Sequence, residues 1–193
     1  REAIRLQEQL VTVSPEDAER HRQLAVSFNN LSAVYLGSAA EQTALCYKSA
    51  LEHQQLAIAS QPDNTDYVME LAATYNNLGS LQSQQQEYAA AAGSYEQAIQ
   101  LQQRLLKADP SRKSYRQDLA ISFNNSGLVQ SRLGQTSEAE EAFGQSVAIQ
   151  ESLVALHPDD MALRSSLGGV YNNLGIALEE QRSYEDAALA YKN

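Results

Sequence analysis

Several residue types are scarce or missing in this chain. It contains no tryptophan and only one cysteine, four prolines and nine glycines among 193 residues. The single cysteine, Cys46, excludes a disulfide framework and a cysteine-based metal site. We expect its thiol to be buried and inert, because it lies in an apolar helical stretch. The three histidines, His21, His53 and His157, are far apart in sequence and lack neighbouring ligands at metal spacing, so no metal site is predicted.

Basic residues are also scarce. The chain has 14 lysines and arginines against 24 aspartates and glutamates, which gives a net charge of −10. A surface with this balance repels nucleic acid and anionic membranes. No apolar run approaches the length of a membrane span. Neither nucleic acid nor a membrane is therefore expected as a partner, and the residues indicate no cofactor.

The few prolines are regularly spaced. They are Pro15, Pro62, Pro110 and Pro158, separated by 47, 48 and 48 residues. An Asn-Asn pair recurs with the same spacings, each time after an aromatic residue: Phe28-Asn29-Asn30, Tyr75-Asn76-Asn77, Phe123-Asn124-Asn125 and Tyr171-Asn172-Asn173. This is an internal repeat, which predicts one elongated array in which each unit contacts mainly its neighbours.

Each repeat has the pattern of two helices. Proline followed by Asp or Asn ends one helix and caps the next, and apolar residues then recur at helical spacing. The predicted helices span residues 1–11, 16–36, 40–60, 64–83, 87–107, 112–132, 136–156, 160–181 and 184–193. They form a partial helix and four repeats, at about 16–61, 63–109, 111–157 and 159–193. The first repeat is one residue short, and we place the deletion in the turn near Gly37.

The repeat resembles the tetratricopeptide repeat. The residues that carry the resemblance in the second repeat are Tyr75, Asn76, Asn77, Leu78, Gly79, Tyr88, Ala91, Tyr95 and Ala98. The Asn-Asn-Leu-Gly run is most similar to the long-helix variety of kinesin light chains and of bacterial proteins that also carry a kinase domain. The resemblance implies an all-α fold, a right-handed α-solenoid of antiparallel helix pairs, over the whole of residues 1–193. Each repeat exceeds the usual length of about 34 residues by about two helical turns per helix.

The small and aromatic positions of the repeat predict its packing. Mid-helix glycine costs up to about 1 kcal/mol relative to alanine, so Gly79, Gly127 and Gly175 imply a close approach. By resemblance, the helix pairs cross where these glycines meet small residues of the partner helix, which are Ala91, Ala139 and Ala187. The aromatic residues expected to fill the wedge between neighbouring repeats are Tyr47, Tyr95, Phe143 and Tyr191.

The Asn pairs are not explained by packing alone, because Asn is a poor helix-interior residue. By resemblance, the second Asn of each pair points into the concave groove of the array and binds the backbone of a peptide; these residues are Asn30, Asn77, Asn125 and Asn173. The first Asn lies about 100° further round the helix and has two open interpretations, groove lining or a bond to the adjacent repeat; these residues are Asn29, Asn76, Asn124 and Asn172. The predicted groove contains one cation, Arg132, so it does not suit a terminal carboxylate.

The sequence therefore predicts a non-enzymatic protein-protein interaction scaffold that binds a peptide or partner segment in its groove. The alternative is a structural spacer or a self-association module, in which apolar residues of the incomplete end repeats pair between copies. We interpret the chain as a fragment of a larger protein. We expect a cytoplasmic location, although the sequence does not identify the compartment or the partner.

Overall fold

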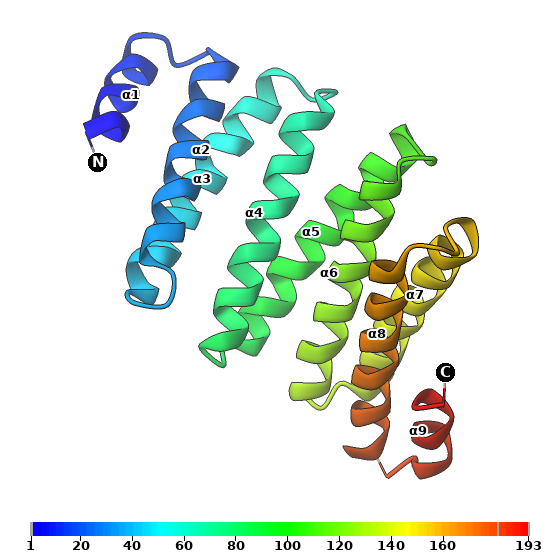
Figure 1. Cartoon of the computed structure of the whole chain (residues 1–193). Helices are drawn as coiled ribbons and strands as arrows, with labels where there is room; N and C mark the ends of the chain where they lie inside the picture. Colours follow the sequence, from blue (N-terminus) through cyan, green and yellow to red (C-terminus); the bar gives the residue numbers. More distant parts are fainter. Residues whose placement is uncertain (1, 181, 193) are drawn as a thin grey trace. The chain divides into compact units, whose positions relative to one another are not determined.

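The computed structural model describes residues 2–180 and 182–192. Within these residues the chain consists of helices and connecting turns and contains no strand (Figure 1). The helices are α1 Glu2–Val13, α2 Ala18–Tyr35, α3 Ala40–Ser60, α4 Thr65–Gln84, α5 Tyr88–Ala108, α6 Lys113–Arg132, α7 Thr136–Leu156, α8 Met161–Glu180 and α9 Tyr184–Ala190. Their bounds lie within three residues of those predicted, and the all-α class is confirmed. None of the described helices has the length and apolar character required to cross a membrane.

The chain divides into two compact units, Arg1–Leu81 and Gln82–Asn193, with the division inside α4. In the first unit, α1 packs on α2 and α2 packs on α3. In the second unit, each helix from α5 to α9 packs on the next one, and α8 also contacts α6. Packing between consecutive helices is the arrangement that a repeat of helix pairs produces.

The helices that follow the prolines begin as the sequence predicts. Asp17, Asn64 and Asp160 precede α2, α4 and α8, and each side-chain oxygen accepts hydrogen bonds from backbone amides two and three residues later. The third repeat differs, because Arg112 precedes α6 and offers no side-chain cap. Its guanidinium lies 4.6 Å from the centre of the Tyr115 ring instead, in a cation–π contact.

The turn between the two helices of a repeat also recurs. Gln86, Gly134 and Arg182, spaced by 48 residues, have φ angles of 63°, 73° and 63°. The residue after each of them donates its backbone amide to the carbonyl five residues earlier, at 2.8 to 2.9 Å. This is a Schellman motif, which ends a helix with one left-handed residue. Only Gly134 adopts that conformation without the steric cost of a Cβ atom.

The one-residue deficit of the first repeat lies at the end of α2 and in the turn after it. α2 ends at Tyr35, whereas α4, 47 residues further on, continues to Gln84. The turn that follows α2 contains Gly37, whose φ is 82°. A shorter helix with a rebuilt turn keeps the phase of α3, since a deletion within a helix would rotate every later residue by about 100°.

Small and aromatic side chains form the core between helices. Ala91, Ala139 and Ala187 have exposed fractions of 0%, 0% and 1%. Phe143 of α7 is also fully buried, in one cluster with Val170 of α8. Full burial of a side chain as large as Phe143 contributes roughly 1.5–3 kcal/mol, and each alanine methyl contributes about 0.8 kcal/mol. Apolar burial is the main source of stability in a repeat without disulfides. Cys46 is buried, and burial raises the pKa of its thiol.

Candidate interaction surface

One face of α6 and the equivalent face of α8 carry a stripe of exposed apolar residues and amides. Along α6, Ile121, Asn125 and Leu128 are four and three residues apart, which places them on one side of the helix. The equivalent positions of α8, 48 residues later, are Gly169, Asn173 and Ile176. The exposed fractions of Ile121, Leu128 and Ile176 are 48%, 39% and 42%, and both amides are half-buried. We call these residues the α6–α8 stripe.

The first Asn of a pair lies between corresponding helices of adjacent repeats. In the first unit, the Asn29 amide of α2 donates to the Thr74 hydroxyl of α4 at 2.9 Å. In the second unit, the Asn124 side-chain oxygen of α6 accepts from the Asn173 amide of α8 at 3.0 Å. These contacts match the interpretation in which the first Asn bonds to the adjacent repeat.

The solvent exposure of the second Asn differs from one pair to the next. Asn30 and Asn77 are exposed, whereas Asn125 and Asn173 are half-buried. Asn173 therefore belongs both to the α6–α8 stripe and to the bond with Asn124. Asn172, the first Asn of the last pair, is exposed. A peptide-binding role for any of these amides stays a prediction.

Ion pairs also connect the first helices of adjacent repeats, between residues about one repeat length apart in the sequence. In the first unit, the Arg22 guanidinium of α2 contacts the Glu70 carboxylate of α4 at 2.7 Å. In the second unit, the Lys113 ammonium of α6 lies 2.7 Å from the Asp160 carboxylate. Lys113 and the backbone amide of Leu163 lower the pKa of Asp160.

Arg132, the one cation predicted on the binding surface, has an acidic partner. Its guanidinium lies 3.4 Å from the Glu180 carboxylate, which also accepts from the Ser131 hydroxyl at 3.3 Å. Both side chains of the ion pair are about half exposed. An arginine that already faces a carboxylate offers a weak site for an additional anion, so the surface is close to neutral at this end.

The mid-helix glycines of two repeats lie against an aromatic ring. A Cβ atom at Gly127 would lie 2.8 Å from the Phe143 ring, and one at Gly175 would overlap the Tyr191 ring. The predicted contact with the alanines of the partner helix stays a prediction. The aromatic ring needs more room than an alanine does, so the missing Cβ atom of glycine provides space for the ring. Gly79 is buried as well.

Two histidines that are 32 residues apart in sequence meet in the first unit. The Nδ1 atoms of His21 on α2 and His53 on α3 lie 3.0 Å apart, and the Phe28 ring stacks on His53 with 6.0 Å between ring centres. The two side chains are therefore in contact although they are far apart in the sequence. No group of three or more His, Cys, Asp or Glu side chains that could hold a metal was found among the described residues.

Sequence reasoning missed a contact between the second helix of one repeat and the first helix of the next. The Gln55 amide donates to the Tyr75 hydroxyl at 3.0 Å, and the Tyr171 hydroxyl donates to the Glu151 carboxylate at 2.7 Å. This bond, together with burial, raises the pKa of Tyr171 to about 12. The signal was visible in the sequence, because Gln55 and Glu151 occupy the same repeat position and so do the two tyrosines.

The repeat pattern also matches a known family. Residues 70–152 match the family model described as tetratricopeptide repeat. This segment consists of tetratricopeptide repeats. The resemblance inferred from the sequence is thereby confirmed, and such repeats typically mediate protein-protein interaction. No curated protein matches the sequence.

Solved structures with the same fold cover nearly all of this chain. MamA is 19% identical, with a TM-score of 0.54 over 98% of this chain and 83% of that one. BtubC (BKLC) from P. vanneervenii is 18% identical, with a TM-score of 0.55 over 98% and 84%. The kinesin light chain TPR-like repeats of Podosopora anserina are 17% identical, with a TM-score of 0.52 over 98% and 92%. At these identities the likeness shows the fold alone, an α-solenoid of tetratricopeptide-like repeats.

Proposed function

We propose that this chain is a non-enzymatic interaction module that binds an extended or helical peptide segment of a partner protein on the α6–α8 stripe. The observation that carries the proposal is the stripe itself, in which exposed apolar residues flank an amide on two adjacent helices. An amide both donates and accepts, so Asn125 suits the backbone of a peptide. Isoleucine and leucine provide apolar contact on either side of it.

Charge narrows the class of peptide. The stripe contains no cation, and Arg132 at the end of α6 already faces Glu180. A segment recognised through its terminal carboxylate needs several cations and is therefore disfavoured. An internal segment with apolar side chains at alternating or helical spacing fits the stripe better.

Peptide-array binding with two variants tests the proposal. Ile121→Ser and Asn125→Ala change side chains on the stripe, and we expect each to weaken binding of array peptides by about tenfold. Asn172→Ala is the matched control, because this amide is exposed on α8 but lies outside the stripe. Melting temperatures of all three variants must stay close to that of the parent. Binding that is unaffected by Ile121→Ser and Asn125→Ala would refute the proposal.

A self-association role is the second candidate. It is favoured by apolar residues exposed on α1, where Leu6 and Leu10 lie one turn apart. Pairing of such faces between copies would remove apolar surface from water. Light scattering at increasing concentration measures it, and Leu6→Gln with Leu10→Gln should return a dimer to the monomer mass. A monomer at all concentrations would exclude this role.

A further inference from the structure

A pocket lies where one junction between repeats lacks a hydrogen bond that two other junctions have. Tyr75 and Tyr171 occupy one repeat position, and each bonds to a side chain of the preceding helix. The same position of the third repeat is Phe123, which has no hydroxyl. The equivalent residue of the preceding helix is Gln103 of α5, whose exposed side chain makes no hydrogen bond within the described part of the chain.

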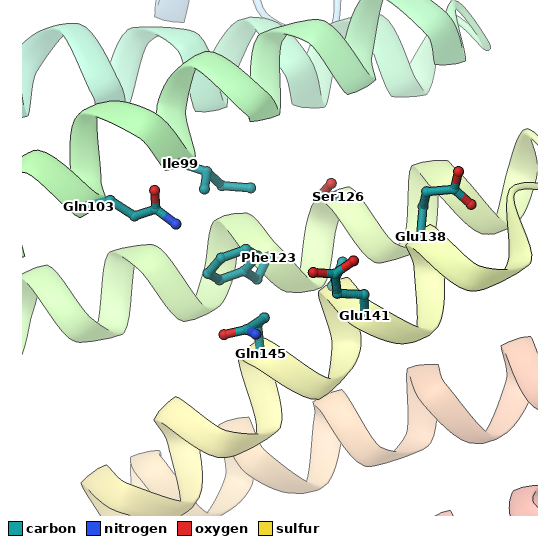
Figure 2. A pocket seen from close by; sticks show the side chains of 8 residues that line it. Ile99, Gln103, Phe123, Ser126, Glu138, Glu141 and Gln145 are labelled. Carbon is teal, nitrogen blue, oxygen red and sulfur yellow. The ribbon is translucent and has the colours of Figure 1, made fainter.

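Figure 2 shows the pocket between α5, α6 and α7 of the second unit, with a volume of about 270 Å³. Phe123 and Ile99 provide apolar lining, and the Gln103 amide lies beside them. Glu138 and Glu141 of α7 bring two carboxylates to the pocket. This volume is slightly below the usual range for small-molecule sites, so it suits one side chain of a protein partner better than a whole cofactor.

The pocket adjoins a larger cavity that lies along α5 and α6. This second cavity has a volume of about 580 Å³ and shares Ile99 and Ser126 with the pocket. Its walls include Gly93 and Glu96 of α5. Gly93 is exposed, and a Cβ atom placed there would meet nothing within 4 Å, so the backbone of a partner has room beside it. A partner segment bound in the cavity can therefore place one of its side chains in the pocket.

The charge of the pocket selects the occupant. Glu138 and Glu141 are exposed, no lysine or arginine is among the residues that line the pocket, and no described ion pair involves either carboxylate. Glu96 adds a third carboxylate in the adjoining cavity. The chain as a whole has a net charge of −10, which also attracts cationic ligands.

We propose that this pocket binds an arginine side chain presented by a partner protein. A guanidinium is planar and weakly hydrated, so it can stack on the Phe123 ring and still donate to carboxylates at its edge. Glu138 and Glu141 would accept those hydrogen bonds, and the Gln103 side-chain carbonyl would accept from the guanidinium as the Glu151 carboxylate accepts from the Tyr171 hydroxyl.

This site is distinct from the α6–α8 stripe and does not depend on it. Phe123 and Asn125 are two residues apart on α6, so they lie about 200° apart around the helix axis. The pocket therefore opens on the side of α6 that faces α5 and α7, whereas the stripe is shared with α8. A failure of peptide binding at the stripe leaves this proposal unaffected, and the reverse also holds.

Nuclear magnetic resonance titration of the whole chain tests the proposal. The ligands are N-acetyl-arginine amide and the corresponding blocked lysine and glutamine. We expect the arginine compound to cause saturable shifts of the backbone resonances of Ile99, Gln103 and Ser126, and to bind more tightly than lysine because only the guanidinium stacks on the ring. The glutamine compound should cause no saturable shift. The arginine affinity should fall as salt is added.

Three variants locate the binding. Phe123→Tyr introduces the residue found at this position in two other repeats, so it should fold normally, bond to Gln103 and reduce arginine affinity by about tenfold or more. Glu141→Gln should have a similar effect, because it removes a charged acceptor. Glu140→Gln is the control, since this exposed carboxylate of α7 does not line the pocket. Equal binding of arginine and glutamine, or arginine shifts that both Phe123→Tyr and Glu141→Gln leave unchanged, would overturn the proposal.

Discussion

The Nδ1 atoms of His21 and His53 lie 3.0 Å apart, and the His21 Nε2 atom lies 2.9 Å from the Pro15 carbonyl oxygen. A carbonyl only accepts, so the His21 Nε2 atom carries a proton and donates it. In neutral His21 the Nδ1 atom is then an acceptor, and His53 donates to it from its own Nδ1 atom. The two Nδ1 atoms can share only one proton, so the arrangement excludes a proton on both of them at once.

The free energy of local unfolding of α2 and α3 should therefore decrease in mild acid. Burial, followed by the neighbouring His21, lowers the pKa of His53 from its ordinary value of 6.5, and Glu52 and Glu8 oppose the shift. A histidine with a depressed folded-state pKa binds fewer protons when folded than when unfolded. The contribution of His53 to stability is therefore fully present above pH 6.5. It is lost as the pH falls from 6.5 through the folded-state pKa of His53. Amide hydrogen exchange of α2 and α3 at several pH values measures the loss.

The variant His53→Asn separates this effect from the general acid sensitivity of the chain. Its side-chain amide can donate to the His21 Nδ1 atom from a similar position, but it does not titrate. We expect the pH dependence of α2 and α3 exchange to be reduced in this variant. His157→Asn should leave it unchanged, because His157 is exposed. An unaltered pH dependence in His53→Asn would show that other groups cause it.

Gly127→Ala should destabilise the second unit although alanine favours helix. The added Cβ atom would lie 2.8 Å from the Phe143 ring, which is fully buried. Overpacking of this kind costs about 1–3 kcal/mol, which exceeds the gain in helix propensity. Urea unfolding gives the change in free energy.

Gly93→Ala is the matched control for Gly127→Ala. Gly93 is also in the interior of a helix, but a Cβ atom there meets nothing within 4 Å. It should therefore stabilise the unit by roughly 0.5–1 kcal/mol, through a smaller loss of backbone entropy. Opposite signs for the two glycines support the role of the Phe143 ring, and equal signs would contradict it.

The hydrogen bond between Asn124 and Asn173 should contribute to stability rather than to binding alone. A double-mutant cycle with Asn124→Ala and Asn173→Ala isolates the interaction, for which we expect a coupling of about 0.5–1.5 kcal/mol. The same cycle with Asn172 in place of Asn173 should give a coupling near zero, since Asn172 is exposed. A negligible coupling for Asn124 and Asn173 would mean that the contact between α6 and α8 is held by other groups.

Asp160 combines two roles that substitution can separate. One carboxylate oxygen accepts from the Lys113 ammonium, and the other accepts from the backbone amides of Ala162 and Leu163 at the start of α8. Asp160→Asn keeps the cap and loses the ion pair, whereas Asp160→Ala loses both. The urea midpoint should therefore fall more in Asp160→Ala than in Asp160→Asn, and least in the exposed neighbour variant Asp159→Ala. Equal losses in Asn and Ala variants would show that the cap adds little.

The sequence by itself determined the features that depend on neighbours along the chain. The spacing of Pro15, Pro62, Pro110 and Pro158 gave the repeat, and apolar spacing with Asp or Asn caps gave helix bounds within three residues of those observed. These signals are local, because a cap, a turn and an amphipathic face involve residues within one or two turns of each other. The small and aromatic positions were recognisable for the same reason.

Only the tertiary structure decided which side chains meet between helices. Whether Asn124 or Asn125 reaches the next repeat depends on the rotation of α6 relative to α8, and an error of one residue rotates the helix by about 100°. The meeting of His21 with His53 and the contact of Gly127 with Phe143 depend in the same way on how two helices approach. The pocket beside Phe123 lies among α5, α6 and α7, so its position required all three helices to be placed.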